Sequence, residues 1–479
     1  MSSSTVRMDG RARGVLFVLC GAIFLEGVDV AMVNVALPSI RAELGLSTGT
    51  LSGVVSAYVL GYGGFMLLGG RAADLLGRRR MFLTWLTVFL VFSGLGGIAT
   101  EGWMLLLARF VTGVAAAFMA PAGLALITGD FPDGPLRTKA LALYAGIAAG
   151  GFSLGLVAGG LLTAFGWRWV FFAPVLLAAL LLAAAIPLVR DSGPDRVPVR
   201  NFDLAGALTI TGAMTLLVYG LVRLEDAGDG LAGTAAVLAA GLVLLGAFVA
   251  IERRAAAPLV RLGILRSGPL VRANIGALLF LGAFAGFQFA LTLYLQELRG
   301  WTPLQTGLAM LVVAIDTVLA PTLTPRLVNR FGAVRVLFGG MVAAAVAYAL
   351  FLPVTADWTY AAMLPTMVLL GVAFTLAYGP LTMVAVEGIA EEEQGLAGGL
   401  FYTALQFGTA IGLSAVTAVN VAALGAATAP DARLAAIRAA LVVPVAAVAA
   451  GAIVTAFGLR RRAVPPAGGP AETPVTASA

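Results

Sequence analysis

Residues Ile23–Pro38 read IFLEGVDVAMVNVALP and place two carboxylates, Glu26 and Asp29, inside an otherwise apolar run. The run begins near residue 14 and continues to residue 36, and about 20 apolar residues suffice for a helix to cross a bilayer. Two residues three positions apart lie on the same side of a helix, one turn from each other. The stretch therefore predicts a membrane helix that carries two acidic groups on one face.

The whole chain has the composition of a membrane protein. Its 479 residues are 60% hydrophobic and 11% charged, with a mean hydropathy of +0.99, which is far too apolar for a soluble protein of this size. The sequence has no histidine, and its one cysteine, Cys20, lies in the first apolar run. A disulfide framework and histidine-bound haem or zinc are thereby excluded, and we expect no metal and no cofactor. Proton chemistry near neutral pH must then come from carboxylates.

Apolar segments of spanning length recur along the chain, and we expect about fourteen membrane helices in an all-α polytopic protein. They are predicted at residues 14–36, 51–70, 82–99, 103–128, 139–164, 169–189, 204–222, 231–251, 271–296, 305–325, 335–353, 359–383, 395–422 and 434–458. An even number leaves both termini on one side, where most of the basic residues then also fall. By the positive-inside rule this side is the cytoplasm, so the basic segments need no nucleic acid to explain them.

Two stretches of the chain are similar to each other, GRAADLLGRRRMF from Gly70 and PRLVNRFGAVRVL from Pro325. Each follows one predicted membrane helix and precedes another, which indicates two repeated bundles. The predicted parts are a cytoplasmic arm (1–13), an N-terminal six-helix bundle (14–190), two inserted helices (203–251), a cytoplasmic linker (252–270), a C-terminal six-helix bundle (271–458) and a disordered cytoplasmic tail (459–479).

Three motifs resemble those of a known family. VDVAMVNVALPSI from Val28, LLARFVTGVAAA from Leu106 and the loop GRAADLLGRR are similar to motifs of the major facilitator superfamily, specifically its fourteen-helix drug:proton antiporter branch. The resemblance implies two six-helix bundles plus two inserted helices, with helices 1 and 4 side by side. It also implies that the loop motif holds the bundles together on the cytoplasmic side when the cavity opens outward. The matching loop residues are Gly70, Asp74, Gly77, Arg78 and Arg79.

The fifth predicted helix departs from the antiporter motif of that branch. The stretch GFSLGLVAGG has Leu156 where the motif has proline, and it keeps four glycines, Gly151, Gly155, Gly159 and Gly160. The glycines permit close helix packing, whereas the kink that proline would supply is missing. Because of this departure, a proton symporter or facilitator for a small-molecule nutrient or metabolite stays open as the alternative to an exporter.

Charged side chains at membrane depth are the candidates for proton coupling. Such groups are costly in a bilayer and persist mainly where they face a cavity or a partner. We expect Asp29 to carry the proton, and to interact with Arg109 of the fourth predicted helix when the proton is off. Glu26 is then either its partner in proton coupling or a charge that selects the substrate. The alternative is a structural polar cluster that only joins helix 1 to its neighbours.

A third acidic residue at membrane depth, Asp316, lies in the predicted helix 305–325. Acidic groups beside aromatic walls favour lipophilic cations through charge and cation–π attraction. The candidate substrate-binding residues are Asp316, Glu26, Asn34, Gln288, Phe289, Tyr378 and Gln406. For the aromatic and amide residues, packing and interhelical hydrogen bonds are equally compatible roles, and for Asp316 the alternative is a place in an aqueous vestibule.

These features predict a proton-coupled exporter of lipophilic, cationic drugs or antibiotics, working by alternating access as a monomer. We expect it in the bacterial cytoplasmic membrane with both termini in the cytoplasm, and its partners are the small-molecule substrate, protons and the lipid bilayer. The sequence has no phosphate-binding loop of the kind that ATP use requires. A membrane enzyme is disfavoured because histidine, a cysteine nucleophile and a metal cluster are lacking, and a sensor would bring a sizeable soluble domain.

Overall fold

The computed structural model describes residues 10–131, 135–190, 203–223, 231–255, 258, 262–390, 394–425, 427 and 429–459. The regular structure of these residues is entirely helical, without a strand among them. Residues 1–9 of the predicted arm, 460–479 of the predicted tail and 256–257 and 259–261 of the predicted linker lie outside the described part.

The first six helices form one group. They are α1 (Gly10–Leu44), α2 (Thr48–Leu76), α3 (Arg78–Gly97), α4 (Gly102–Asp130), α5 (Pro135–Phe165) and α6 (Trp169–Leu188). Within this group α1 packs on α5, α2 packs on α4, and α3 packs on α4 and α6. We call this group the N-terminal bundle.

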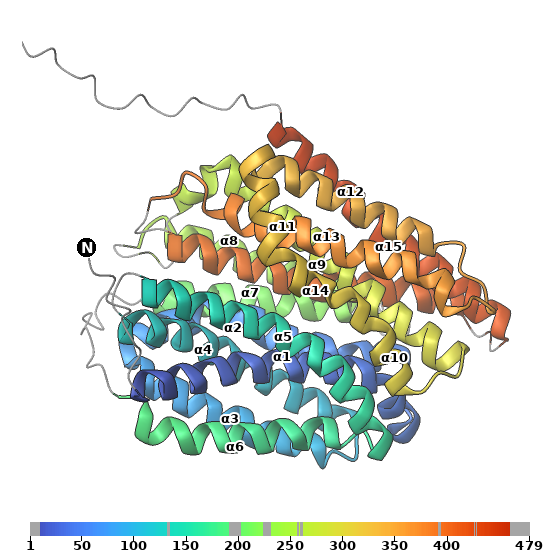
Figure 1. Ribbon diagram of the computed structural model, residues 1–479, viewed down its shortest axis with the longest axis horizontal. Coiled ribbons are helices and arrows are strands. Elements are labelled where there is room, and N and C mark those ends of the chain that lie inside the picture. The colour runs from blue at the N-terminus through green and yellow to red at the C-terminus, as the bar shows by residue number, and fades with distance from the viewer. Residues whose placement is uncertain are drawn as a thin grey trace, which may run out of the picture.

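A second group, the C-terminal bundle, follows a short 3-10 helix, η2 (Leu262–Arg266). It contains α9 (Gly268–Thr292), the π-helical turn η3 (Leu293–Leu298), α10 (Pro303–Met310), the 3-10 turn η4 (Leu311–Ile315), α11 (Asp316–Phe331), α12 (Ala333–Phe351), α13 (Tyr360–Val386), α14 (Gln394–Leu424) and α15 (Pro430–Leu459). Here α9 packs on α14 and α15, and α12 packs on α13 and α15. In Figure 1 the helices of this bundle run obliquely to those of the N-terminal bundle.

The inserted helices α7 (Leu204–Arg223) and α8 (Leu231–Glu252) pack on each other and lie between the two bundles in Figure 1. Helix α7 contacts α2 of one bundle and α14 of the other. On the α2 side, Gly64 lies beside Thr211 and Thr215. On the α14 side, Ile210 and Phe248 form a small apolar cluster with side chains at the start of α14. The inserted pair therefore bridges the bundles.

The lengths of the helices agree with a membrane protein of many spans. In the described part, eleven helical segments are long and apolar enough to cross a membrane. Helices α2, α5 and α7, of 29, 31 and 20 residues, occupy the positions of the remaining predicted spans. Every one of the predicted segments therefore corresponds to helical structure.

Two predicted helices differ in detail. The sequence predicts that the first helix ends at residue 36, but α1 continues through Pro38 to Leu44. Proline removes one backbone hydrogen bond. Membrane helices tolerate this loss because packed neighbours satisfy the freed group. The segment 305–325 was predicted as one helix, but η4 interrupts it. At this turn Gly371 of α13 comes so close that an added methyl group would lie 2.6 Å from the carbonyl oxygen of Val313. Hydropathy alone does not detect the interruption because the turn, LVVAI, is as apolar as a helix.

Candidate functional site

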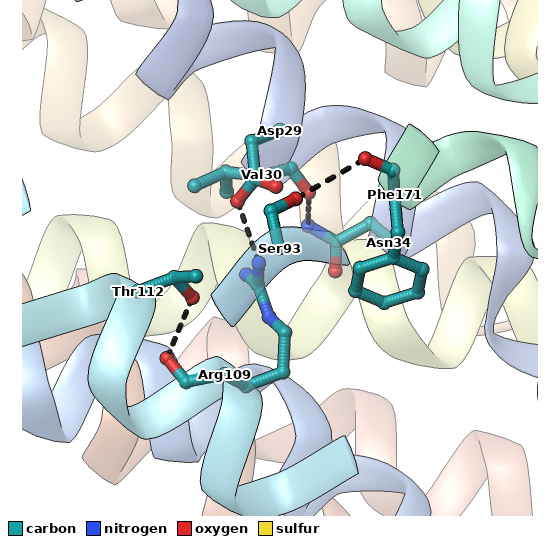
Figure 2. Close-up of polar contacts among 7 residues, drawn as sticks. All are labelled: Asp29, Val30, Asn34, Ser93, Arg109, Thr112 and Phe171. Carbon is teal, nitrogen blue, oxygen red and sulfur yellow. Dashed lines mark hydrogen bonds and ion pairs between the residues drawn. The ribbon is translucent and has the colours of Figure 1, made fainter. Parts of the chain in front are cut away.

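Asp29 and Arg109 form a buried ion pair between α1 and α4. The Nη1 atom of Arg109 donates to Oδ2 of Asp29 at 2.5 Å (Figure 2), and the two side chains are 2% and 0% exposed, respectively. The guanidinium carbon also lies 4.4 Å from the ring centroid of Tyr58 on α2, which is a cation–π distance. The contact expected from the sequence is therefore present, and the two charges neutralise each other inside the bundle.

The pair leaves part of its hydrogen-bonding capacity unused. Within the described residues, Oδ1 of Asp29 and Nε of Arg109 are buried without a hydrogen-bond partner. Buried polar atoms are usually satisfied, so such exceptions need an explanation. A carboxylate oxygen left free in this way can still accept a proton.

Asn34 lies on α1 near this pair but is engaged within its own helix. Its Nδ2 atom donates to the carbonyl oxygen of Val30 at 2.9 Å, as Figure 2 shows. Thr112 likewise donates to the carbonyl oxygen of Arg109 at 2.9 Å. Each of these bonds lies within a single helix, and the substrate role expected for Asn34 stays a prediction.

Glu26 lies one turn before Asp29 and differs from it in its partners. Its side chain is buried, and Oε2 accepts a hydrogen bond of 3.2 Å from the hydroxyl of Tyr62 on α2. In the described part of the chain, no basic side chain pairs with Glu26. One of the two carboxylates on α1 is thus neutralised by an arginine, and the other is not.

The other candidate substrate residues lie on three helices of the C-terminal bundle. Gln288 and Phe289 of α9 are buried, and Phe289 packs in a cluster that consists mainly of N-terminal-bundle side chains. Gln406 of α14 lies against α2, since a methyl group at Gly63 would be 3.0 Å from its Cβ. Tyr378 of α13 is 38% exposed. These residues do not converge on a single point.

Asp316 of the C-terminal bundle and four tyrosines, two from each bundle, add further polar groups. Asp316 is the first residue of α11, directly after η4, and it lies within electrostatic range of Tyr378. The tyrosines are Tyr62, Tyr144, Tyr378 and Tyr402. The candidates from the sequence include Tyr378 but not the other three, since tyrosines on α2, α5 and α14 carry no spacing signal that relates them.

The loop motif between α2 and α3 is anchored within the N-terminal bundle. Gly77 has a φ of +94°, a conformation that glycine adopts without strain. Arg78 donates to the carbonyl oxygen of Ala125 at 3.3 Å, and Arg79 donates to that of Val189 at 2.6 Å. These carbonyls lie near the C-terminal ends of α4 and α6, where cations are favourable. Gly70 and Asp74 lie in the last turns of α2, and the side chain of Asp74 is outside the described part.

The helix 5 glycines allow α5 to approach two neighbours. A methyl group at Gly155 or Gly159 would lie 2.8 Å or 2.6 Å from backbone atoms of α1, and Gly151 has a similar contact. Gly160 instead faces α10, where the distance to the Cα atom of Leu304 would be 2.6 Å. Leu156, at the position of the missing proline, is buried, and its carbonyl oxygen meets Gly307 of α10. The motif therefore packs α5 against α1 through three glycines and against α10 of the C-terminal bundle through Gly160.

The end of the molecule at which α1 ends, here called the distal end, is closed by contacts between the bundles. Nη1 of Arg41 lies 3.0 Å from both carboxylate oxygens of Glu297 in η3. Next to it, Gln296 donates to the carbonyl oxygen of Val35 at 2.9 Å. A pocket of about 660 Å³ adjoins this ion pair and is also lined by Arg433. None of these residues was a candidate in the sequence analysis.

Two helical bundles, with a buried ion pair and an unpaired carboxylate inside the first, together with the family match define a membrane transporter, not an enzyme. Residues 19–413 match the family model of the Major Facilitator Superfamily, and the chain belongs to this superfamily.

Its sequence is 36% identical to a puromycin resistance protein of Streptomyces alboniger, over 86% of this chain and 82% of that protein. It is 34% identical to a cephamycin export protein of Amycolatopsis lactamdurans, over 85% and 84% of the two chains. Among solved structures, the POT family transporter PepTSo is similar in fold with a TM-score of 0.68, at 15% identity and over 94% and 99% of the two chains.

Proposed function

We propose that this protein exports lipophilic, amine-bearing drugs or antibiotics across the cytoplasmic membrane in exchange for protons. The observation that supports this most directly is the unequal pairing on α1, where Asp29 is neutralised by Arg109 and Glu26 has no basic partner. The resemblance to a puromycin resistance protein and a cephamycin export protein supports antibiotics as the substrate class.

Exchange follows from the charge of Glu26. An isolated ionised carboxylate is unfavourable at membrane depth, so Glu26 requires either a bound proton or the cationic group of a substrate. Proton and substrate then exclude each other at one site, and this linkage couples their movements in opposite directions. The sequence pointed to Asp29 as the proton carrier, but its pairing with Arg109 leads us to assign the shared site to Glu26. Asp29 acts through its unused oxygen, by loosening its bond to Arg109 when it is protonated.

Alternating access requires the two ends of the molecule to open in turn. We place the distal end on the outside and both termini in the cytoplasm, as the positive-inside rule suggests. In this orientation the Arg41–Glu297 contact closes the outer side, as is expected of a form that loads substrate from the cytoplasm.

The alternative is a symporter or facilitator, and Leu156 in the helix 5 motif is the observation that favours it. The test is proton movement in liposomes that contain the purified protein and a pH-sensitive dye. Puromycin added against an imposed proton gradient is expected to drive proton flux in the wild type, and Glu26→Gln is expected to abolish it. A symporter would move protons in the same direction as the drug, and a facilitator would move none.

The control is Glu387→Gln, which makes the same change at an exposed position at the end of α13. It is expected to leave the flux unchanged. Flux that persists in Glu26→Gln but disappears in Asp29→Asn would return the proton to Asp29 and contradict our assignment.

A further inference from the structure

Four of the nine tyrosines in the chain lie between Glu26 of the N-terminal bundle and Asp316 of the C-terminal bundle. They come from four different helices, α2, α5, α13 and α14. Tyr62 bonds Glu26 directly, and Tyr144 lies within electrostatic range of both Glu26 and Tyr402. The bond of Tyr62 to Glu26 is a direct contact, and the other three hydroxyls lie within electrostatic range of these groups.

Tyr402 is the central member of this group. Its side chain lies within electrostatic range of Tyr378, of Glu26 and of Tyr62. Tyr378 in turn lies near Asp316. Tyr402 is therefore the tyrosine of this group that lies near residues of both bundles.

The exposed surface of Tyr402 faces the interior of the transporter. The residue is 45% exposed, which on a membrane helix would ordinarily mean contact with lipid. However, Gln406 lies four residues later and hence on the same face of α14, and this residue packs against Gly63 of α2. The partners of Tyr402 also belong to both bundles, so its exposed area lies between them, where a substrate passes.

Phenol hydroxyls supply chemistry that a binding site for purely lipophilic cations does not use. An aromatic ring attracts a cation whether or not it carries a hydroxyl, and phenylalanine would suffice for that. A hydroxyl both donates and accepts hydrogen bonds. A site that offers such groups discriminates strongly against ligands that leave them unpaired. The tyrosines therefore suit a substrate with hydrogen-bonding groups of its own.

We propose that Tyr402, together with Tyr378, selects amine substrates that carry hydroxyl or amide groups over cations that lack them. The inference rests on the proposed function, in which Glu26 holds the cationic group. The tyrosine hydroxyls bond the polar groups of the substrate, about one turn of α14 from the contact between Gln406 and Gly63 of α2.

The test compares two cationic probes by equilibrium binding to the purified protein. Puromycin carries an amine, an amide and hydroxyl groups, whereas tetraphenylphosphonium is a permanent cation without hydrogen-bonding groups. Tyr402→Phe is expected to raise the Kd for puromycin by about threefold to tenfold, the value of one hydrogen bond. Its Kd for tetraphenylphosphonium is expected to stay the same, because the ring is retained. Tyr378→Phe is expected to act in the same way.

The matched control is Tyr219→Phe, at a position of α7 that is also 45% exposed and contacts Arg223. It is expected to change neither Kd. Equal weakening of both probes by Tyr402→Phe, or no weakening of either, would overturn the inference. Binding of puromycin by a wild type that moves no protons would overturn the proposed exchange instead, and the ratio of the two Kd values would still decide the role of Tyr402.

Discussion

Arg109 and Asp29 are 80 residues apart in the sequence, but Nη1 of Arg109 lies 2.5 Å from Oδ2 of Asp29 in the structure. The bond joins α1 to α4 at a depth where neither group is accessible. Because each charge satisfies the other, the bundle can hold both in an apolar environment. The same pairing isolates Glu26, one turn away on α1, as a carboxylate that needs a different counter-charge.

We expect the Asp29–Arg109 pair to be essential for stability. Arg109→Gln leaves a buried carboxylate uncompensated and is expected to lower the free energy of unfolding by about 3 kcal/mol or more. The double variant with Asp29→Asn removes both charges and is expected to recover part of this loss. Unfolding of the purified protein in mixed micelles measures both.

Glu43→Gln serves as the control for that measurement. It removes the charge of an ion pair with Arg168 in which Glu43 is 53% exposed, and exposed pairs contribute about 1 kcal/mol or less. If the double variant were as unstable as the single one, mutual neutralisation would not be the reason for the loss.

Drug binding is expected to depend on pH through Glu26. Protons compete with a cationic substrate for one carboxylate, so the affinity for tetraphenylphosphonium, a cation that does not itself titrate, is expected to increase as pH rises. Glu26→Gln removes the competition, and its weaker binding is expected to be independent of pH. Isothermal titration between pH 5.5 and pH 8.5, chosen to bracket neutrality, tests this, and an unchanged pH dependence in the variant would exclude Glu26 as the shared site.

Much of the membrane topology follows from sequence because the length of an apolar segment is a local property. The Asp29–Arg109 contact was expected for a different reason, since the motifs around both residues resemble those of one family. Neither kind of signal exists for Arg41 and Glu297, which are 256 residues apart and lie in two different bundles. In the sequence, each of the two residues is indistinguishable from an ordinary charged residue near the end of a membrane helix.

The same limit applies to the polar region of the C-terminal bundle. Asp316 was recognised from its depth, but the turn η4 before it is uniformly apolar and gives no sign of a break. Tyr402 is one of many aromatic residues in its region of sequence, and only packing of α14 against α2 relates it to Glu26. Contacts that depend on how two bundles meet are not encoded in any short stretch.

Closure of the distal end is expected to depend on the close approach of α5 to α10. A methyl group at Gly307 would overlap the carbonyl oxygen of Leu156, so Gly307→Ala is expected to separate the helices and favour the distal-open form. Cross-linking of Arg41→Cys with Glu297→Cys reports closure, and the one native cysteine, Cys20, is buried. Gly150→Ala on α5, which has nothing within 4 Å, is expected to leave the cross-link yield unchanged.

The Arg41–Glu297 pair is expected to set the balance between the two forms of the transporter. Its side chains are 32% and 25% exposed, so water screens the attraction and the pair contributes about 0.5–1 kcal/mol to the closed form. Glu297→Gln is therefore expected to shift the equilibrium about twofold to fivefold toward the distal-open form. A fluorophore pair placed across the distal end measures this shift. The exchanged pair, Arg41→Glu with Glu297→Arg, restores opposite charges and is expected to return the equilibrium to the wild-type value, whereas a purely steric role would leave it as open as the single variant.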